Sequence, residues 1–143
     1  MAVPARVSIV TLGVADLGRS IAFYEAIGWE RCASSIEDVI CWFRTADSYL
    51  GLFPYDELAA DAQISSPSRG TFGGVTLAIN VEREQDVAAA LEEAAAAGAT
   101  ILKPATTLPF GISGYFADPD GYAWEVAFNP SFPLGEDGRI TIA

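Results

Sequence analysis

The chain has 143 residues, 51% of them hydrophobic, and 19 acidic against eight basic residues give a formal net charge of −11. This length suits one domain with its own core, and so few basic residues, spread along the chain, predict neither a nucleic-acid nor a membrane partner. No apolar run reaches the roughly 20 residues of a membrane span and no signal-peptide pattern is present, so we expect a cytoplasmic protein.

The first half of the chain predicts the element order β-α-β-β-β. Residues 6–14 are rich in β-branched side chains, which favour a strand. Asp16 is a predicted N-cap for a helix over residues 17–27, whose apolar positions recur at helical spacing and which Gly28 ends. Three further strands are predicted at residues 29–34, 39–44 and 49–54.

A polar stretch rich in Ser, Pro and Gly, residues 55–74, separates the two halves, with a short helical turn at 57–62 as an option. The second half then repeats the plan of the first. A strand at 75–81 precedes an alanine-rich helix at 85–97, which Gly98 ends. Strands follow at 100–104, 112–117 and 122–128, so the predicted order is again β-α-β-β-β.

This internal repeat sets the expected fold. "VTLGV" at residues 10–14 echoes "VTLAINV" at 75–81, and "AIGWE" at 26–30 echoes "AAGAT" at 96–100. Two tandem βαβββ modules predict an α+β fold with two curved mixed sheets around a central cavity and the helices outside. We expect a single domain over residues 1–143, with module one at 6–55, a linker at 56–73, module two at 74–129 and a C-terminal tail at 130–143.

The same segments resemble a known family. "VADL" at residues 14–17 leads into "RSIAFYEAIGW" at 19–29, the alanine-rich helix ends in "AGA" at 97–99, and "DPDGY" at 118–122 runs into Trp124 and Glu125. In this order, over about residues 7–129, they resemble the vicinal oxygen chelate superfamily of glyoxalases, bleomycin-resistance proteins and extradiol dioxygenases. The resemblance implies modules paired around a metal or ligand cavity, within a chain or across a dimer, and we expect a homodimer.

The resemblance also names four positions for a metal. Metal-dependent members take one ligand from the first strand and one from the late strand of each module, usually His, Glu or Gln. On this sequence the positions fall at Ile9, Thr76, about Gly51, and Glu125. Only Glu125 carries a strong donor, whereas a catalytic metal needs about three protein ligands. The sequence has no histidine, which excludes His-based triads and His-dependent zinc sites, so we expect no metal and no cofactor.

Strand alternation assigns candidate side chains to the cavity. Val75, Leu77, Ile79 and Val81 are expected under the module-two helix, so Thr76, Ala78 and Asn80 face the other way. Aromatic residues are candidate cavity walls, and the glycine-containing loop at 108–114 is a candidate lid. The predicted ligand-binding residues are Thr11, Trp42, Phe53, Thr76, Asn80, Phe110, Tyr115 and Glu125.

Glu125 lies between two alanines in an apolar strand, and three interpretations of it remain open. It is a surface carboxylate, in solvent or paired with an arginine such as Arg44. Alternatively it orients a ligand in an apolar cavity, where desolvation also suits a general acid or base. The third interpretation is a metal ligand completed by main chain and water. Asp118 and Asp120 are expected to form the turn before this strand.

Cys32 and Cys41 are the only cysteines. A hairpin that turns near residues 36–37 would bring them opposite each other, but we expect reduced core thiols in a cytosolic chain. Cys41 has no histidine partner that would make it a nucleophile.

Two functions of different class follow. The first is a metal-free protein, similar to the bleomycin-resistance branch, that holds a small aromatic or cationic molecule in the cavity, because the acidic net charge attracts cations. The second is an enzyme of the same family, a lyase, isomerase or dioxygenase, that uses Glu125 as its base or as the remnant of a metal site. A regulatory or partner-binding module that keeps the fold is a third, weaker interpretation.

Overall fold

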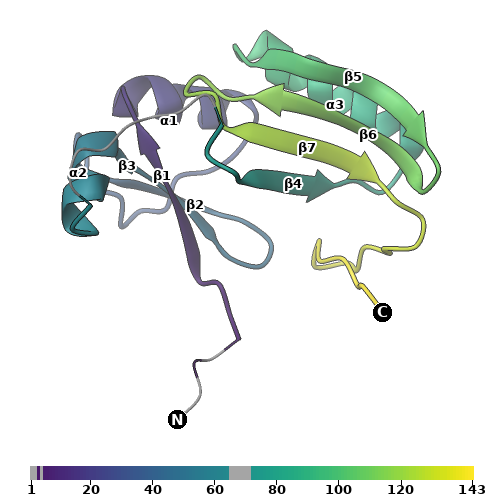
Figure 1. The fold of residues 1–143 in the computed structure, drawn as a ribbon, viewed down its shortest axis with the longest axis horizontal. Helices are drawn as coiled ribbons and strands as arrows, with labels where there is room; N and C mark the ends of the chain where they lie inside the picture. Colours follow the sequence, from purple (N-terminus) through teal and green to yellow (C-terminus); the bar gives the residue numbers. More distant parts are fainter. Residues whose placement is uncertain (1–2, 4, 65–71) are drawn as a thin grey trace. The chain divides into compact units, whose positions relative to one another are not determined.

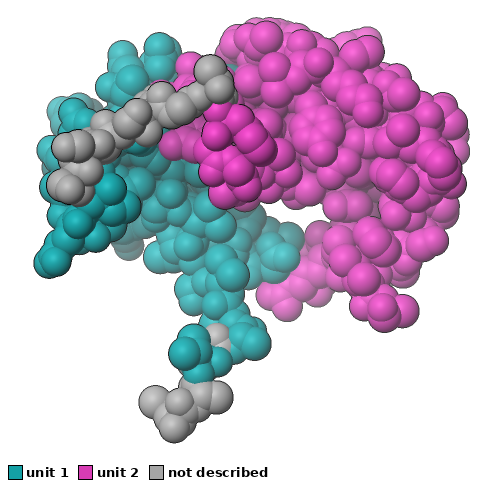
Figure 2. All heavy atoms as spheres, viewed as in Figure 1, with its two compact units in different colours: residues 1–67 teal, residues 68–143 magenta. Residues whose placement is uncertain are grey.

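The computed structural model describes residues 3, 5–64 and 72–143. The chain divides into two compact units, residues 1–67 and 68–143 (Figure 2). Part of the predicted linker at 56–73 lies outside the described residues. Its first residues, 56–61, belong to helix α2 (Tyr55–Asp61). The module boundaries stay predictions. No helix among the described residues is long and apolar enough to cross a membrane.

Unit 1 contains a three-stranded sheet (Figure 1). The chain forms β1 (Ile9–Val14), α1 (Leu17–Ala26), β2 (Cys41–Arg44), β3 (Tyr49–Pro54) and then α2. The central strand β3 pairs with β1 in parallel and with β2 antiparallel. Asp16 caps α1 as predicted, because its Oδ1 accepts the Arg19 backbone N–H at 3.0 Å. Gly28 follows the helix with a φ of 95°, a conformation that glycine adopts without strain.

The strand predicted at residues 29–34 is wrong. Arg31 forms only an isolated bridge with Phe43, and the Ser35 N–H then closes a turn onto the Cys32 carbonyl at 3.0 Å. The Ser35 hydroxyl accepts the Trp42 N–H, also at 3.0 Å. Such side-chain bonds to the backbone compete with the ladder of a sheet. The first sheet therefore has three strands where the repeat predicted four.

Unit 2 follows the predicted βαβββ order. Its elements are β4 (Thr76–Asn80), α3 (Glu84–Ala96), β5 (Thr100–Leu108), β6 (Gly111–Ala117) and β7 (Ala123–Phe128). The strand order is β4-β7-β6-β5, with β4 parallel to β7 and the other pairs antiparallel. Helix α3 lies along the sheet (Figure 1) and buries Val87, Leu91 and Ala94. The predicted mixed α+β fold is confirmed.

One detail of the second unit differs from the prediction and another agrees with it. Val75 was expected to pack under the helix, but it precedes β4 and is 60% exposed. The predicted turn before the last strand is confirmed, since Asp118 Oδ1 accepts the N–H groups of Asp120 and Tyr122, both at 2.9 Å. This turn directs the chain into β7 and so fixes where Glu125 lies along the strand.

Candidate functional site

Glu125 lies in the middle of β7, an inner strand of the four-stranded sheet. Its side chain is half-buried, and its Oε2 accepts a hydrogen bond from the Ser113 hydroxyl of β6 at 2.7 Å. Ser113 is only 1% exposed, so a buried donor holds one oxygen of the carboxylate. The other oxygen, Oε1, has no hydrogen-bond partner among the described residues and can accept a bond from a ligand.

The strand register defines which side chains share a face with Glu125, because paired residues on neighbouring strands point to the same side. Its row across the sheet runs from β4 to β5 as Ala78, Glu125, Tyr115 and Lys103. The rows on either side are Asn80, Ala127, Ser113 and Thr106, and Thr76, Ala123, Ala117 and Thr100. These three rows are called the Glu125 face.

Helix α3 packs on the opposite face of the sheet. A Cβ added to Gly114 would lie 2.6 Å from Leu91 Cδ1 of the helix and 2.9 Å from the Lys103 carbonyl oxygen. Phe116 and Val126, which share this face by alternation, are 2% and 0% exposed. The helix therefore buries the face that Gly114 belongs to, and Glu125 lies on the other side of the sheet.

Tyr115 lies beside Glu125 in the same row. Burial raises the pKa of its phenol above the ordinary 10.0, and the negative charge of Glu125 raises the pKa further. The electrostatic effect of Glu125 agrees with the register, which places both side chains on one face. At neutral pH Tyr115 is therefore a neutral ring with a hydroxyl donor next to the carboxylate.

The sequence prediction is partly reproduced in this unit. The register brings four predicted ligand-binding residues, Thr76, Asn80, Tyr115 and Glu125, to one face. Phe110 instead lies in the tight turn between β5 and β6 and is 47% exposed. The loop at 108–114, a candidate lid, is a tight turn instead, because Leu108 pairs with Gly111 and the residues from Gly111 onwards belong to β6.

Two residues of the Glu125 face were missed by sequence reasoning. Ser113 lies in the strand predicted at 112–117, but it was also part of the candidate lid loop and was not assigned to a face. Lys103 could not be assigned to a face by alternation, because the register shifts between Ile101 and Lys103 and again between Lys103 and Thr106. One signal was available in the sequence: Lys103 is the only lysine of the chain.

The first unit has an equivalent face. Thr11, Gly51 and Trp42 form one row across β1, β3 and β2, and Phe53 lies two residues along β3 on the same side. A Cβ on Gly51 would lie 3.0 Å from Thr11 Oγ1 and 3.3 Å from Trp42 Cδ1, so both side chains lie close to the glycine. Three predicted ligand-binding residues, Thr11, Trp42 and Phe53, thus share one side of the sheet of unit 1.

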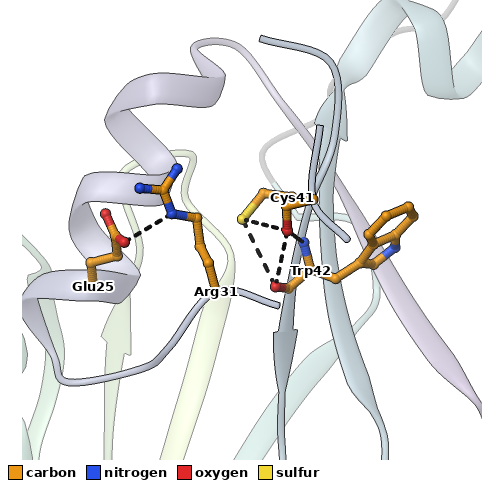
Figure 3. Close-up of polar contacts among 5 residues, drawn as sticks. Glu25, Arg31, Cys41 and Trp42 are labelled. Carbon is orange, nitrogen blue, oxygen red and sulfur yellow. Dashed lines mark hydrogen bonds and ion pairs between the residues drawn. The ribbon is translucent and has the colours of Figure 1, made fainter. Parts of the chain in front are cut away.

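Arg44, which was considered as a partner of Glu125, belongs to this first sheet. Its guanidinium carbon lies 5.2 Å from the centroid of the Tyr49 ring, within the range of a cation–π contact. The indole of Trp42 points away from the side of β2 that carries the Cys41 sulfur (Figure 3). This alternation is what an extended strand imposes.

Both cysteines are free thiols, Cys32 partly exposed and Cys41 1% exposed. The Cys41 sulfur accepts a weak hydrogen bond from the Ser35 hydroxyl at 3.8 Å. Burial raises the pKa of the Cys41 thiol, which makes it a poor nucleophile. The Glu25–Arg31 ion pair, 2.9 Å long, lies on the same side of β2 (Figure 3) and is exposed. These observations agree with the expected reduced core thiol.

The four positions implied by the family resemblance do not fit a divalent metal. In unit 1, Ile9 pairs with Tyr49, and Gly51 lies two residues after Tyr49. In unit 2, Thr76 pairs with Ala123, and Glu125 lies two residues after Ala123. Gly51 therefore has the position in unit 1 that Glu125 has in unit 2. Ile9 and Gly51 offer no side-chain donor and Thr76 only a hydroxyl. No group of three His, Cys, Asp or Glu side chains comes together among the residues that the structure describes.

Comparisons with known proteins identify the family. Residues 6–126 match the family model described as the Glyoxalase/Bleomycin resistance protein/Dioxygenase superfamily. A glyoxalase-related enzyme from Fulvimarina pelagi is similar in structure, with a TM-score of 0.86, 36% sequence identity, and 98% of this chain and 99% of that chain covered. No match was found among curated proteins.

Two more distant structures share the fold. A lactoylglutathione lyase from Agrobacterium tumefaciens has a TM-score of 0.66 at 23% identity, covering 87% of this chain and 94% of that one. A genomically encoded fosfomycin resistance protein from Listeria monocytogenes has a TM-score of 0.66 at 24% identity, covering 89% and 95%. With the family model spanning most of its length, the chain belongs to the glyoxalase, bleomycin-resistance and dioxygenase superfamily, also known as the vicinal oxygen chelate superfamily.

Proposed function

We propose that this protein binds a small molecule against the Glu125 face, with Glu125 as the orienting group and without a divalent metal. The hydrogen bond from buried Ser113 to Glu125 carries the proposal, because it fixes the carboxylate and leaves one oxygen unpartnered. Ala78, Ala123 and Ala127 surround the carboxylate with small side chains, which leave room for a ligand.

The chemistry of this face favours a ligand with a cationic or hydrogen-bond-donating group and an aromatic ring. The unpartnered Oε1 of Glu125 accepts the donor, and the neutral ring of Tyr115 offers a surface for stacking. The net charge of −11 raises the local concentration of cations around the protein. We also propose that the protein is cytoplasmic and that it forms a homodimer. Light scattering of the purified chain tests the homodimer.

Titration of the protein with benzylamine, followed by NMR, tests the proposed function. Glu125→Gln keeps the shape of the side chain and removes its charge. We expect about a fivefold loss of benzylamine affinity, because a half-exposed charged contact contributes about 1 kcal/mol to binding. Glu92→Gln, on the exposed surface of α3, removes the same charge elsewhere and is the matched control. Equal affinity of the wild type and Glu125→Gln contradicts the proposal.

A second candidate function is catalysis with Glu125 as the base, since an unpartnered carboxylate oxygen lies beside a protonated phenol. The relatives described above as a glyoxalase-related enzyme and a lactoylglutathione lyase also support it. An enzyme converts a bound compound over time, which appears as new ligand resonances that Glu125→Gln abolishes. A binding protein leaves the spectrum of the ligand unchanged.

A further inference from the structure

Lys103 is the one positive charge on the Glu125 face, and the only lysine in a strongly acidic chain. It lies on β5 and pairs with Tyr115, which pairs with Glu125 on the next strand. Lys103 and Glu125 are therefore two strands apart, or about 10 Å between their backbones, with the ring of Tyr115 between them.

The position of Lys103 depends on an irregular strand. The three β5 residues on the Glu125 face, Thr100, Lys103 and Thr106, are spaced by three, because the register shifts in each interval. Pro104 lies in the second interval, and β5 is an edge strand where proline is tolerated. Gly114 lets the Lys103 carbonyl come close to β6, since a Cβ there would lie 2.9 Å from that oxygen. Bulges of this kind re-aim side chains.

A simple surface ion pair does not account for Lys103. Its ammonium has no ion-pair partner among the described residues, and Glu125 is bonded instead to Ser113. The lysine is half-buried. Lysines in such positions commonly pack their aliphatic part against the protein and keep the charged end in solvent. The row thus presents a positive group, an aromatic ring and a negative group in that order.

On the basis of the proposed function, we infer that the ligand of the Glu125 face carries opposite charges at the two ends of a ring, with an anionic group on Lys103 and a cationic group on Glu125. A ring lying over Tyr115 spans the two strands between these groups. The inference narrows the ligand class from cationic aromatic molecules to zwitterionic ones with separated charges.

Three small probes test this inference by NMR titration. Benzylamine carries only the cation, benzoate only the anion, and 4-(aminomethyl)benzoate carries both at opposite ends of the ring. We expect 4-(aminomethyl)benzoate to bind the wild type about fivefold more tightly than benzylamine, as a half-exposed ion pair allows, and this advantage to shrink as salt rises.

Variants of Lys103 identify the source of the advantage. Lys103→Met should remove it, so that 4-(aminomethyl)benzoate and benzylamine bind this variant about equally tightly, whereas Lys103→Arg should keep most of it. Arg139→Met, which removes an exposed positive charge from the C-terminal tail, is the matched control and should also keep it.

The outcomes separate this inference from the proposed function. If 4-(aminomethyl)benzoate binds no more tightly than benzylamine, or if Lys103→Met leaves its advantage intact, the inference is wrong, while the proposed function holds as long as benzylamine binding depends on Glu125. If the binding of no probe depends on Glu125, the proposed function fails and this inference fails with it.

Discussion

Substitution of Gly114 by alanine tests the assignment of the two sheet faces, on which the candidate site depends. A Cβ at residue 114 would lie 2.6 Å from Leu91 Cδ1, 2.9 Å from the Lys103 carbonyl oxygen and 3.2 Å from the Ala105 nitrogen. Leu91 is 5% exposed and has little room to move, and the other two atoms belong to the backbone of β5. The added methyl group must therefore displace packed atoms.

The expected loss of stability follows from two opposing effects. Overpacking of this kind costs about 1–3 kcal/mol, and two contacts below 3.0 Å place Gly114→Ala in the upper part of that range. The smaller entropy of the unfolded alanine chain offsets about 0.4–1 kcal/mol of this cost. We therefore expect Gly114→Ala to lower the free energy of unfolding by about 2 kcal/mol.

Urea unfolding, followed by circular dichroism, measures this change through the midpoint at constant slope. Gly73→Ala is the matched control, because a Cβ there meets nothing within 4 Å, and it should be neutral or slightly stabilising. If Gly114→Ala is as stable as Gly73→Ala, Leu91 does not pack over residue 114. Helix α3 would then not cover that face, and the placement of Ser113, Tyr115 and Glu125 on the opposite face would lose its support.

Two further predictions concern the neighbours of Glu125. Because the pKa of the Tyr115 phenol is raised in the folded protein, its contribution to stability is complete below pH 10.0 and is lost as the pH rises through the folded value. Glu125→Gln should lower this pKa part of the way, as measured by ultraviolet absorbance titration, with Tyr115→Phe to assign the signal. An unchanged pKa would contradict the contact between Tyr115 and Glu125. Ser113→Ala should lower the free energy of unfolding by about 1–2 kcal/mol and weaken benzylamine binding less than Glu125→Gln does. Substitution of the exposed Ser131 by alanine is the control and should change neither quantity. Benzylamine affinity that is unchanged in Ser113→Ala would show that the hydroxyl does not position the carboxylate.

The fold was predictable because short-range sequence features mark the ends of the repeated helices and strands. Asp16 at the start of α1, Gly28 and Gly98 after the helices, and the turn at Asp118 each specify a boundary that short-range chemistry determines. The missing strand at 29–34 was not predictable from propensity, since the hydrogen bonds of the Ser35 hydroxyl to the Trp42 backbone depend on two segments meeting in the folded chain.

The candidate site was predictable only where strands are regular. Alternation placed Thr76, Asn80 and Glu125 on one face, because β4 and β7 pair without a shift. It failed for Lys103, because bulges in β5 change the period from two to three. Alternation was not applied to Ser113, although it lies in the strand predicted at 112–117, because the two glycines around it are also typical of a loop. In the structure Gly111 makes a tight turn and Gly114 makes room for Leu91.

A metal titration tests whether Glu125 binds a ligand without a divalent metal. The measurement is elemental analysis of the untagged protein, beside thermal-shift titrations with Mn²⁺, Fe²⁺, Ni²⁺ and Zn²⁺; a polyhistidine tag must be absent because it would supply the ligands that this chain lacks. We expect no stoichiometric metal and no shift in unfolding temperature. Stoichiometric metal together with a shift that Glu125→Ala abolishes would contradict it.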